Sequence, residues 1–511
     1  MPSQPPIHPH GVVRGLDKIQ SSEQFEGRFG RMFRTLPPAH FTDDDLGALA
    51  QAMVAKADTP TPEDQIDDEE NTGTSSDPGI SAGYTYLGQF IDHDLTFDPA
   101  SSLQKQNDPD GLVDFRTPRF DLDNLYGRGP NDQPYLYAAD GVRMLLGRTL
   151  TGNPHDPRTR DVERNAPDTG PKRALIGDPR NDENVIVSQL QSTFLRFHNR
   201  VADVLNAANT ADFPTVQRLV RWHYQWVVVN DFLPTILGAK QLGAILPHVA
   251  RQTSILKDPP DLRFFRWKRE PFMPVEFSVA AYRFGHSMVR PIYRLNTRLP
   301  GRQDIFSIDP TSSLTGFREF PANWAIDWQL FFRFAGKPPS TGPNRVQPAY
   351  KIDTSLVNPL GNLPPSIAVD PSSLARRNLL RGRSMGLPSG QAVARKIGVP
   401  VVPDGNLRVG KATEADAKSN PLLVELSPRF RDNAPLWYYI LAESQQAFAR
   451  NDTPIRLGPV GARIVGEVFA GLLVGDQHSY FNQDPTWKPL EQFTQGGKFG
   501  IVELISQAQQ A

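Results

Sequence analysis

The chain has 511 residues, with 55 basic and 56 acidic side chains and a formal net charge of −1 at neutral pH. This balance, without any block of lysine or arginine, argues against nucleic acid as a partner. The absence of cysteine excludes disulfides, zinc–thiolate sites and iron–sulfur clusters. Because no apolar run is long enough to span a bilayer, we expect a soluble cytoplasmic protein without a membrane partner, unless it is exported by a route that lacks a recognisable signal peptide.

The start of the chain and its connections are polar. Residues 1–30 predict an extended N-terminal arm, and residues 59–77 (TPTPEDQIDDEENTGTSSD) predict a flexible acidic connector with nothing to bury. The chain has 48 prolines and 39 glycines, which predict long irregular loops, among them residues 98–118, 152–172 and 338–371. No clear linker separates the remaining blocks, so we expect residues 31–511 to form one domain.

Between these loops, apolar residues recur at helical spacing. The pattern predicts helices over residues 186–207, 216–233, 275–289, 436–449 and 460–473, the second of them ending at Pro234. Alternation typical of strands is rare. The sequence therefore predicts a mainly α fold, a single large helical domain with long Pro/Gly-rich loops and very little β structure.

The first segment with chemical content is GQFIDHDLT, residues 88–96. On a helix, Gln89, Asp92 and His93 share one face, whereas Asp94 is turned by about 100° toward a different neighbour. Such a string is often only a solvated polar turn or a packed core histidine. Here the surrounding apolar residues predict that three ionisable groups are buried together, and buried charges need a partner, a metal or a cofactor.

Three later segments each carry one or two candidate residues. The run DPRNDE contains Arg180 and Glu183, although a proline followed by acids is also an ordinary helix start. The run AYRFGHSMVR contains His286, which taken alone is better explained as a packed core histidine, and its neighbouring glycine leaves room for a flat group. The run NLLRGRSMGLP contains Asn378, a hydrogen-bonding partner for an imidazole, and Arg381.

A fifth segment, TPRFDLDNLYG at residues 117–127, alternates hydroxyl and carboxylate groups. Thr117, Asp121 and Asp123, with an intervening carbonyl, offer the several oxygens that a hard cation prefers. An acidic Asx-turn without a cation explains the same residues equally well. The segment therefore leaves a cation site and a simple turn as open alternatives.

In their order and internal spacing, the five segments resemble the animal haem peroxidases, the family of myeloperoxidase, lactoperoxidase and thyroid peroxidase. The resemblance runs from about residue 84 to the C-terminal helices, and we expect the chain to be a bacterial member of this family within the peroxidase–cyclooxygenase superfamily. It implies a haem b cofactor. It also implies that His93, Arg180 and Gln89 are catalytic on the distal side of the haem and that His286 binds the iron on the proximal side.

The resemblance implies further contacts with the haem. Asn378 would hold the proximal imidazole, Arg381 would meet a propionate, and Arg283 would also lie against the cofactor. Asp92 and Glu183 match the residues that can form esters with haem methyl groups. In the family, the loop and the aspartate after the distal histidine share one Ca²⁺, which implies ligation by Asp94, Thr117, the carbonyl of Arg119, Asp121 and Asp123.

The sequence departs from the family at two places. Asn184 stands where myeloperoxidase has the methionine of its sulfonium link to haem, and Ser384 and Met385 replace an Asp-His pair. Neither departure touches the distal pair His93 and Arg180. The match to the mammalian enzymes is therefore weaker than the match to the superfamily.

The resemblance implies a peroxidase that reduces H2O2 and oxidises halides, thiocyanate, or phenolic and other small organic donors. One alternative is a fatty-acid dioxygenase of the same superfamily, in which a radical-forming tyrosine lies three residues before the proximal histidine. That position is Arg283 here, and Tyr282 lies one place away, about 100° around a helix. The other alternative is a haem-binding protein without catalysis, against which the retained His93 and Arg180 argue. The sequence does not indicate the oligomeric state.

Overall fold

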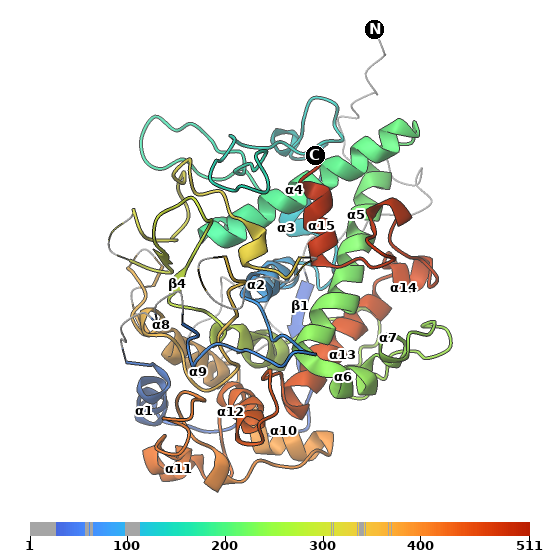
Figure 1. Cartoon of the computed structure of the whole chain (residues 1–511). Coiled ribbons are helices and arrows are strands. Elements are labelled where there is room, and N and C mark those ends of the chain that lie inside the picture. Colours follow the sequence, from blue (N-terminus) through green and yellow to red (C-terminus); the bar gives the residue numbers. More distant parts are fainter. Residues whose placement is uncertain are drawn as a thin grey trace.

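The computed structural model describes residues 27–56, 61, 65–97, 113–307, 309, 311–334, 336, 342, 344–365, 367–368 and 370–511. Helices dominate, and the strands of the described residues form two small sheets (Figure 1). In the first sheet, β1 (Gly27–Gly30) pairs antiparallel with β2 (Val113–Asp114) and parallel with β3 (Met273–Pro274). In the second, β4 (Ile292–Tyr293) pairs antiparallel with β5 (Gln303–Asp304). This architecture confirms the predicted mainly α fold with little β structure.

The longer helices pack around α2 (Gly83–Leu95), which lies in the middle of the molecule (Figure 1). It packs against α4 (Val185–Ala207), and α4 packs in turn against α5 (Phe213–Val227) and α15 (Ile501–Ala508). On another side, α13 (Pro459–Gly475) packs against α6 (Leu233–Ile245) and α12 (Leu436–Ala449). The shorter helices are α1 (Asp43–Met53), α3 (Asp123–Tyr126), α7 (Pro247–Arg251), α8 (Asn358–Gly361), α9 (Leu374–Ser384), α10 (Gly390–Ile397), α11 (Leu423–Leu426) and α14 (Tyr480–Gln483).

Aromatic packing fixes α2 against its neighbours. Phe90 of α2 stacks on Phe194 of α4 with ring centroids 4.4 Å apart. Tyr224 of α5 meets both rings edge-on, at 6.2 Å and 5.9 Å. Stacked and edge-on rings are favourable arrangements that also bury a large apolar area. The face of α2 that carries Phe90 is thereby held in the core, which leaves its other faces to position polar groups.

Three predicted helices are confirmed almost to the residue. The predictions of 186–207, 436–449 and 460–473 correspond to α4, α12 and α13. Each is long and has a sustained apolar periodicity, the condition under which the pattern is most informative. The start of α4 is also fixed locally, because Oδ1 of Asn184 accepts hydrogen bonds from the backbone N–H groups of Ile186 and Val187.

Two predicted helices are wrong in detail. The helix predicted over 216–233 does not stop before Pro234, because a π-helical turn, Val228–Phe232, leads into α6, where this proline occupies the first turn. A proline is tolerated there because its missing N–H would have had no helical partner. The helix predicted over 275–289 is instead a π-helical turn, Glu276–Ala280, followed by a 3-10 helix, Ala281–His286.

The predicted acidic connector is only partly within the described residues, and the predicted N-terminal arm lies outside them up to residue 26. Contrary to the expectation that the connector buries nothing, Glu70 and Asn71 are buried. The carboxylate of Glu70 pairs with Arg290 at 2.8 Å and Arg345 at 2.6 Å. Such an ion group ties the segment to the core, a tertiary effect that an acidic composition does not reveal. Among the described residues, no helix is long and apolar enough to cross a membrane.

Candidate active site

His93 lies on α2 with its side chain buried. Its Nδ1 lies 2.7 Å from Oδ1 of Asn181, and Nδ2 of Asn181 donates to Oε1 of Gln191 at 2.9 Å. The second bond sets which end of the Asn181 amide faces His93, so Nδ1 of His93 must carry a proton and donate it. Nε2 therefore keeps its lone pair and can accept a proton.

The electrostatic surroundings keep this imidazole neutral. Burial, and next the positive charge of Arg180, lower the pKa of His93 to about 3. At physiological pH the ring is therefore in the form that a general base requires. Its Nε2 lies 3.8 Å from Oε1 of Glu183, so the proton-accepting side of the ring faces a second polar group.

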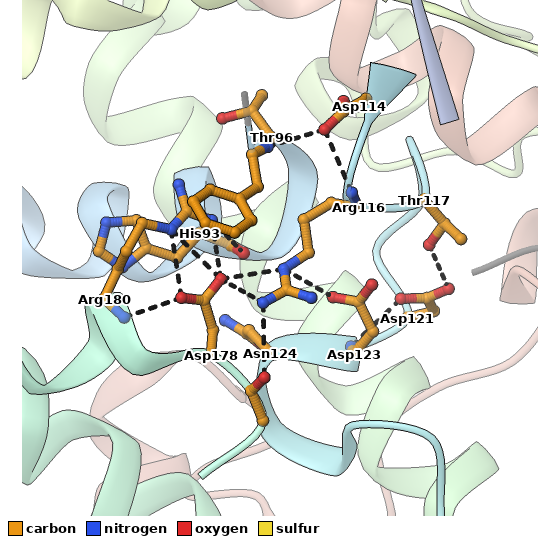
Figure 2. A network of polar contacts seen from close by, with 12 residues as sticks. His93, Thr96, Asp114, Arg116, Thr117, Asp121, Asp123, Asn124, Asp178 and Arg180 are labelled. Atoms are coloured by element: carbon orange, nitrogen blue, oxygen red, sulfur yellow. Dashed lines mark hydrogen bonds and ion pairs between the residues drawn. The ribbon is translucent and has the colours of Figure 1, made fainter. Parts of the chain in front are cut away.

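Arg180 lies beside His93 in a 3-10 helix, Pro179–Asp182 (Figure 2). Asp178 caps this turn by accepting from the backbone N–H of Arg180 at 2.8 Å. The guanidinium donates from Nη2 to Asp178 at 2.8 Å and to the carbonyl oxygen of His93 at 3.1 Å, and its Cζ lies 4.4 Å from the ring centroid of Phe97. Arginine and histidine are thus fixed to one another as well as to the scaffold.

Asp178 is shared between two arginines. It is fully buried, and Arg116 donates to it from Nε at 2.9 Å as well as from Nη2. Burial alone would raise the pKa of Asp178, but the charge and hydrogen bonds of Arg180, with the charge of Arg116, hold it well below its usual range. The carboxylate is therefore ionised at all physiological pH values and remains a permanent anchor for Arg180.

The polar residues around His93 form a chain of amides and carboxylates. Nε2 of Gln89 donates to Oε1 of Glu183, and Oε1 of Gln89 accepts from Nδ2 of Asn184 at 3.1 Å. Burial raises the pKa of Glu183 to about 7, and burial also raises the pKa of Asp92, which accepts from the Thr96 hydroxyl at 3.2 Å. Gln89, His93 and Glu183 therefore lie close together, and Asp92 directly precedes His93 on α2.

On the facing side, His286 ends the 3-10 helix Ala281–His286, which packs against α2. Nδ2 of Asn378 lies 2.8 Å from Nδ1 of His286, while Oδ1 of Asn378 accepts from Nη1 of Arg283 at 2.9 Å. Asn378 therefore contacts His286, but its acceptor oxygen is turned away from the imidazole, because it is bound to the guanidinium of Arg283. An iron ligand at Nε2 needs its proton on Nδ1, so metal binding requires this amide to turn over.

Gly285 leaves space directly beside His286. A Cβ built on Gly285 would meet no atom within 4 Å, so the backbone before the histidine borders open space. Burial, and next the charge of Arg283, lower the pKa of His286 to about 3, which keeps the imidazole neutral. Arg381 lies on α9, three residues after Asn378. A neutral imidazole and the space at Gly285 are compatible with a haem, provided that the Asn378 amide turns over.

The predicted cation loop brings three carboxylates together. Ligand atoms of Asp94, Asp121 and Asp123 all lie within 4.8 Å of one another. Both oxygens of Asp94 and Oδ1 of Asp123 are buried without a hydrogen-bond partner in the described part of the chain. Thr117 donates to Asp121 at 2.7 Å, and Arg119 lies two residues before Asp121 in the same loop. Burial, and next the neighbouring Asp121, raise the pKa of Asp94 and of Asp123 well above the usual value.

Comparison with known proteins decides the family. The model of the animal haem peroxidase family matches residues 101–505. The chain belongs to the animal haem peroxidase family. Thyroid peroxidase from Canis lupus familiaris is 28% identical over 422 residues, covering 75% of this chain and 39% of the relative. Peroxidasin from Drosophila melanogaster is 23% identical over 346 residues, covering 66% of this chain and 20% of the relative, so the chain spans well under half the length of these relatives.

Solved structures show the same haem peroxidase fold. Peroxidase A from Dictyostelium discoideum matches with a TM-score of 0.60 at 17% identity, covering 94% of this chain and 93% of that chain. A fatty-acid α-dioxygenase from Oryza sativa matches with a TM-score of 0.53 at 14% identity, covering 93% and 79%. At these identities the likeness concerns the fold alone.

The family match begins after α2, so the arrangement of Gln89, Asp92 and His93 rests on the geometry of this chain itself. Sequence reasoning missed two residues that orient the distal pair. Asn181 was not singled out, and Asp178 offers only the weak signal of a capping position before Arg180. Asn181 lies 88 positions from His93, a spacing that no helix or turn rule reveals.

Proposed function

We propose that this protein is a haem peroxidase that reduces H2O2 and oxidises small donors. The observation that carries the proposal is the neutral His93, whose Nδ1 proton is held by Asn181 and whose Nε2 is available beside Arg180. A haem held through His286 would supply the redox chemistry. The protein would supply proton transfer and a fixed positive charge.

The proton-transfer roles follow from the two distal side chains. Nε2 of His93 would take a proton from H2O2 and return it to the departing oxygen, a general base turned general acid worth about 10²- to 10⁴-fold in rate. Arg180 would stabilise the negative charge that grows as the O–O bond breaks. Its own partner Asp178 is ionised throughout, so the orientation of the guanidinium would not depend on pH.

Two carboxylates support covalent attachment of the cofactor. Asp92 and Glu183 lie on the α2 side of the site and match the ester-forming residues of the family, whereas Asn184 has no thioether to form a sulfonium link. Asn184 instead caps α4 and holds Gln89. Without that link the oxidant should be weaker than in myeloperoxidase, which favours bromide, iodide, thiocyanate and phenols over chloride as donors.

We also propose that the loop binds Ca²⁺. Three carboxylates so close together repel one another unless a cation or protons neutralise them, and the oxygens of Asp94, which have no hydrogen-bond partner among the described residues, are suited to a hard cation. Asp121, the hydroxyl of Thr117 and the carbonyl of Arg119 would complete the ligand set. Since Asp94 directly follows His93 on α2, the ion would fix the distal helix.

Fatty-acid oxygenation is less well supported, although α-dioxygenases share the fold. The position that holds their radical-forming tyrosine is Arg283, which donates to Ser278 and Asn378. The neighbouring Tyr282 stacks on Phe277 with ring centroids 4.8 Å apart, and within the described residues its hydroxyl has no partner. A buried phenol without a proton acceptor is poorly suited to form a radical.

Donor competition tests the proposed function. The haem-loaded protein is mixed with H2O2 and, separately, with bromide, thiocyanate, a phenol or chloride, and peroxide consumption is followed. We expect turnover with the first three donors and little with chloride. Loaded protein that consumes no peroxide with any donor would refute the peroxidase function, and efficient chloride oxidation at neutral pH would refute the inferred oxidising strength.

A further inference from the structure

Arg116 is a nearly buried arginine that the mechanism above does not use. It lies directly before the acidic loop, and only 13% of its side chain is exposed. Its guanidinium lies between Asp178 and Asp123 (Figure 2). The Nε atom donates to Asp178 at 2.9 Å and lies 3.6 Å from Oδ1 of Asp123, and Nη2 also reaches the carbonyl oxygen of Gly177 at 3.4 Å.

We propose that Arg116 is a positioning residue that ties the acidic loop to the distal arginine through Asp178, a role that rests on the proposed peroxidase function. Asp178 has two oxygens, and Arg116 and Arg180 both donate to Oδ2. Because Nε and Nη2 of Arg116 both donate to Oδ2, this oxygen is a fixed acceptor for Arg180. The position of the Arg180 guanidinium therefore depends on Arg116.

A second, backbone route links the same parts. Oδ1 of Asp114 accepts from the backbone N–H of Arg116 at 3.2 Å and from that of Phe97 at 2.7 Å. The ring of Phe97 lies under both guanidinium groups, 5.7 Å from Cζ of Arg116 and 4.4 Å from Cζ of Arg180. Cation–π contact and the shared carboxylate thus restrict Arg180 from two sides. The first route runs through the side chain of Arg116, and the second through its backbone and its contact with Phe97.

The consequence should be visible in the rate. A donor aimed at developing charge works only in a precise place, and misplacement by about 1 Å can cost about 10²-fold. Arg116→Gln keeps both Arg180 and Asp178 but removes the guanidinium that holds Asp178 in place. We expect the bimolecular rate constant for H2O2 to fall by about tenfold, with the haem spectrum and proximal ligation unchanged.

A double-mutant cycle separates positioning from simple loss of structure. The rate constant is measured by stopped flow for the haem-loaded wild type, Arg116→Gln, Arg180→Lys and the double variant. We expect Arg116→Gln to lower the rate constant by about tenfold when residue 180 is arginine. When residue 180 is lysine, which cannot make a two-point contact with Asp178, the loss should be less than about twofold. The affinity of the ferric haem for fluoride, an anion that the guanidinium would stabilise, should follow the same non-additive pattern.

A matched control and a conservative variant complete the test. Arg196→Gln breaks another buried arginine–aspartate pair, with Asp156, away from the site and should lower thermal stability without changing the rate constant. Arg116→Lys keeps the charge and should lower the rate constant by about threefold, again only in the background that retains Arg180. This conservative variant replaces Arg116→Gln in the test if Arg116→Gln fails to hold haem. Equal losses in both backgrounds, or a wild-type rate in Arg116→Gln, overturn the positioning role. A wild type that does not react with H2O2 overturns the proposed function, and the inference with it.

Discussion

The hydrogen bond between Asn181 and His93 offers a sharp test, because two substitutions of one residue should act in different ways. Asn181→Leu removes the acceptor and leaves the Nδ1–H of His93 buried and unsatisfied, which costs about 1–3 kcal/mol. The other tautomer, with its proton on Nε2, escapes that cost but is no base. We therefore expect the rate constant for H2O2 to fall by about 5- to 150-fold at every pH.

Asn181→Asp should instead change the pH dependence. His93 must be neutral to accept a proton, so the rate falls as pH falls through its pKa, which is about 3 in the wild type. A carboxylate 2.7 Å from Nδ1 favours the imidazolium and raises that pKa by about 1 to 3 units. The wild-type rate should thus be flat from about pH 5 to 8, whereas the Asp variant should lose rate as the pH falls through a value between about 4 and 6.

The assay is stopped-flow mixing of haem-loaded protein with H2O2 across this pH range. Asn153→Leu is the matched control, since Asn153 is also buried and bonded, at 2.7 Å to the carbonyl oxygen of Ile326, but lies outside the site. It should cost stability and leave the rate constant and its pH profile unchanged. If both Asn181 variants keep the wild-type profile, the tautomer argument fails.

Three further results are expected. Asp121→Ala, or prolonged chelation, should lower thermal stability and slow the reaction with H2O2 by about tenfold, with the proximal histidine still on iron; full activity in this variant, or active protein without Ca²⁺, would show a simple acidic turn. After peroxide turnover, haem should stay with the protein in acidic organic solvent through esters to Asp92 and Glu183, and complete extraction would argue against them. Long-chain fatty acids should not be oxygenated, since Arg283 forms no radical, and O2 uptake lost in Tyr282→Phe would contradict this.

The sequence predicted the elements whose signals are local. The helices α4, α12 and α13 were predictable because their apolar periodicity runs over several turns, and the shared face of Gln89, Asp92 and His93 follows from helical spacing alone. The π-helical turns at Val228–Phe232 and Glu276–Ala280 were not, because their apolar residues fit an ordinary helix equally well. Tertiary packing decides between the two.

The contacts that orient the catalytic groups were not predictable. Asn181 and His93 are 88 positions apart, and Arg116 and Asp178 are 62 apart. Asparagine in an acidic run and arginine before a turn both have ordinary surface explanations. The reversed amide of Asn378 also depends on a neighbour, Arg283, that lies 95 positions away. Such partners become visible only once the fold brings the elements together.

The central claim is that His93 and Arg180 together drive the reaction with peroxide. Stopped-flow spectra of the haem-loaded wild type, His93→Ala and Arg180→Ala test it most directly, each mixed with H2O2 and then with bromide, thiocyanate or a phenol. We expect a rapid change in the haem spectrum of the wild type that the donors reverse, and a loss of about 10²-fold or more in either variant. A spectral change equally fast in His93→Ala or Arg180→Ala would contradict the account.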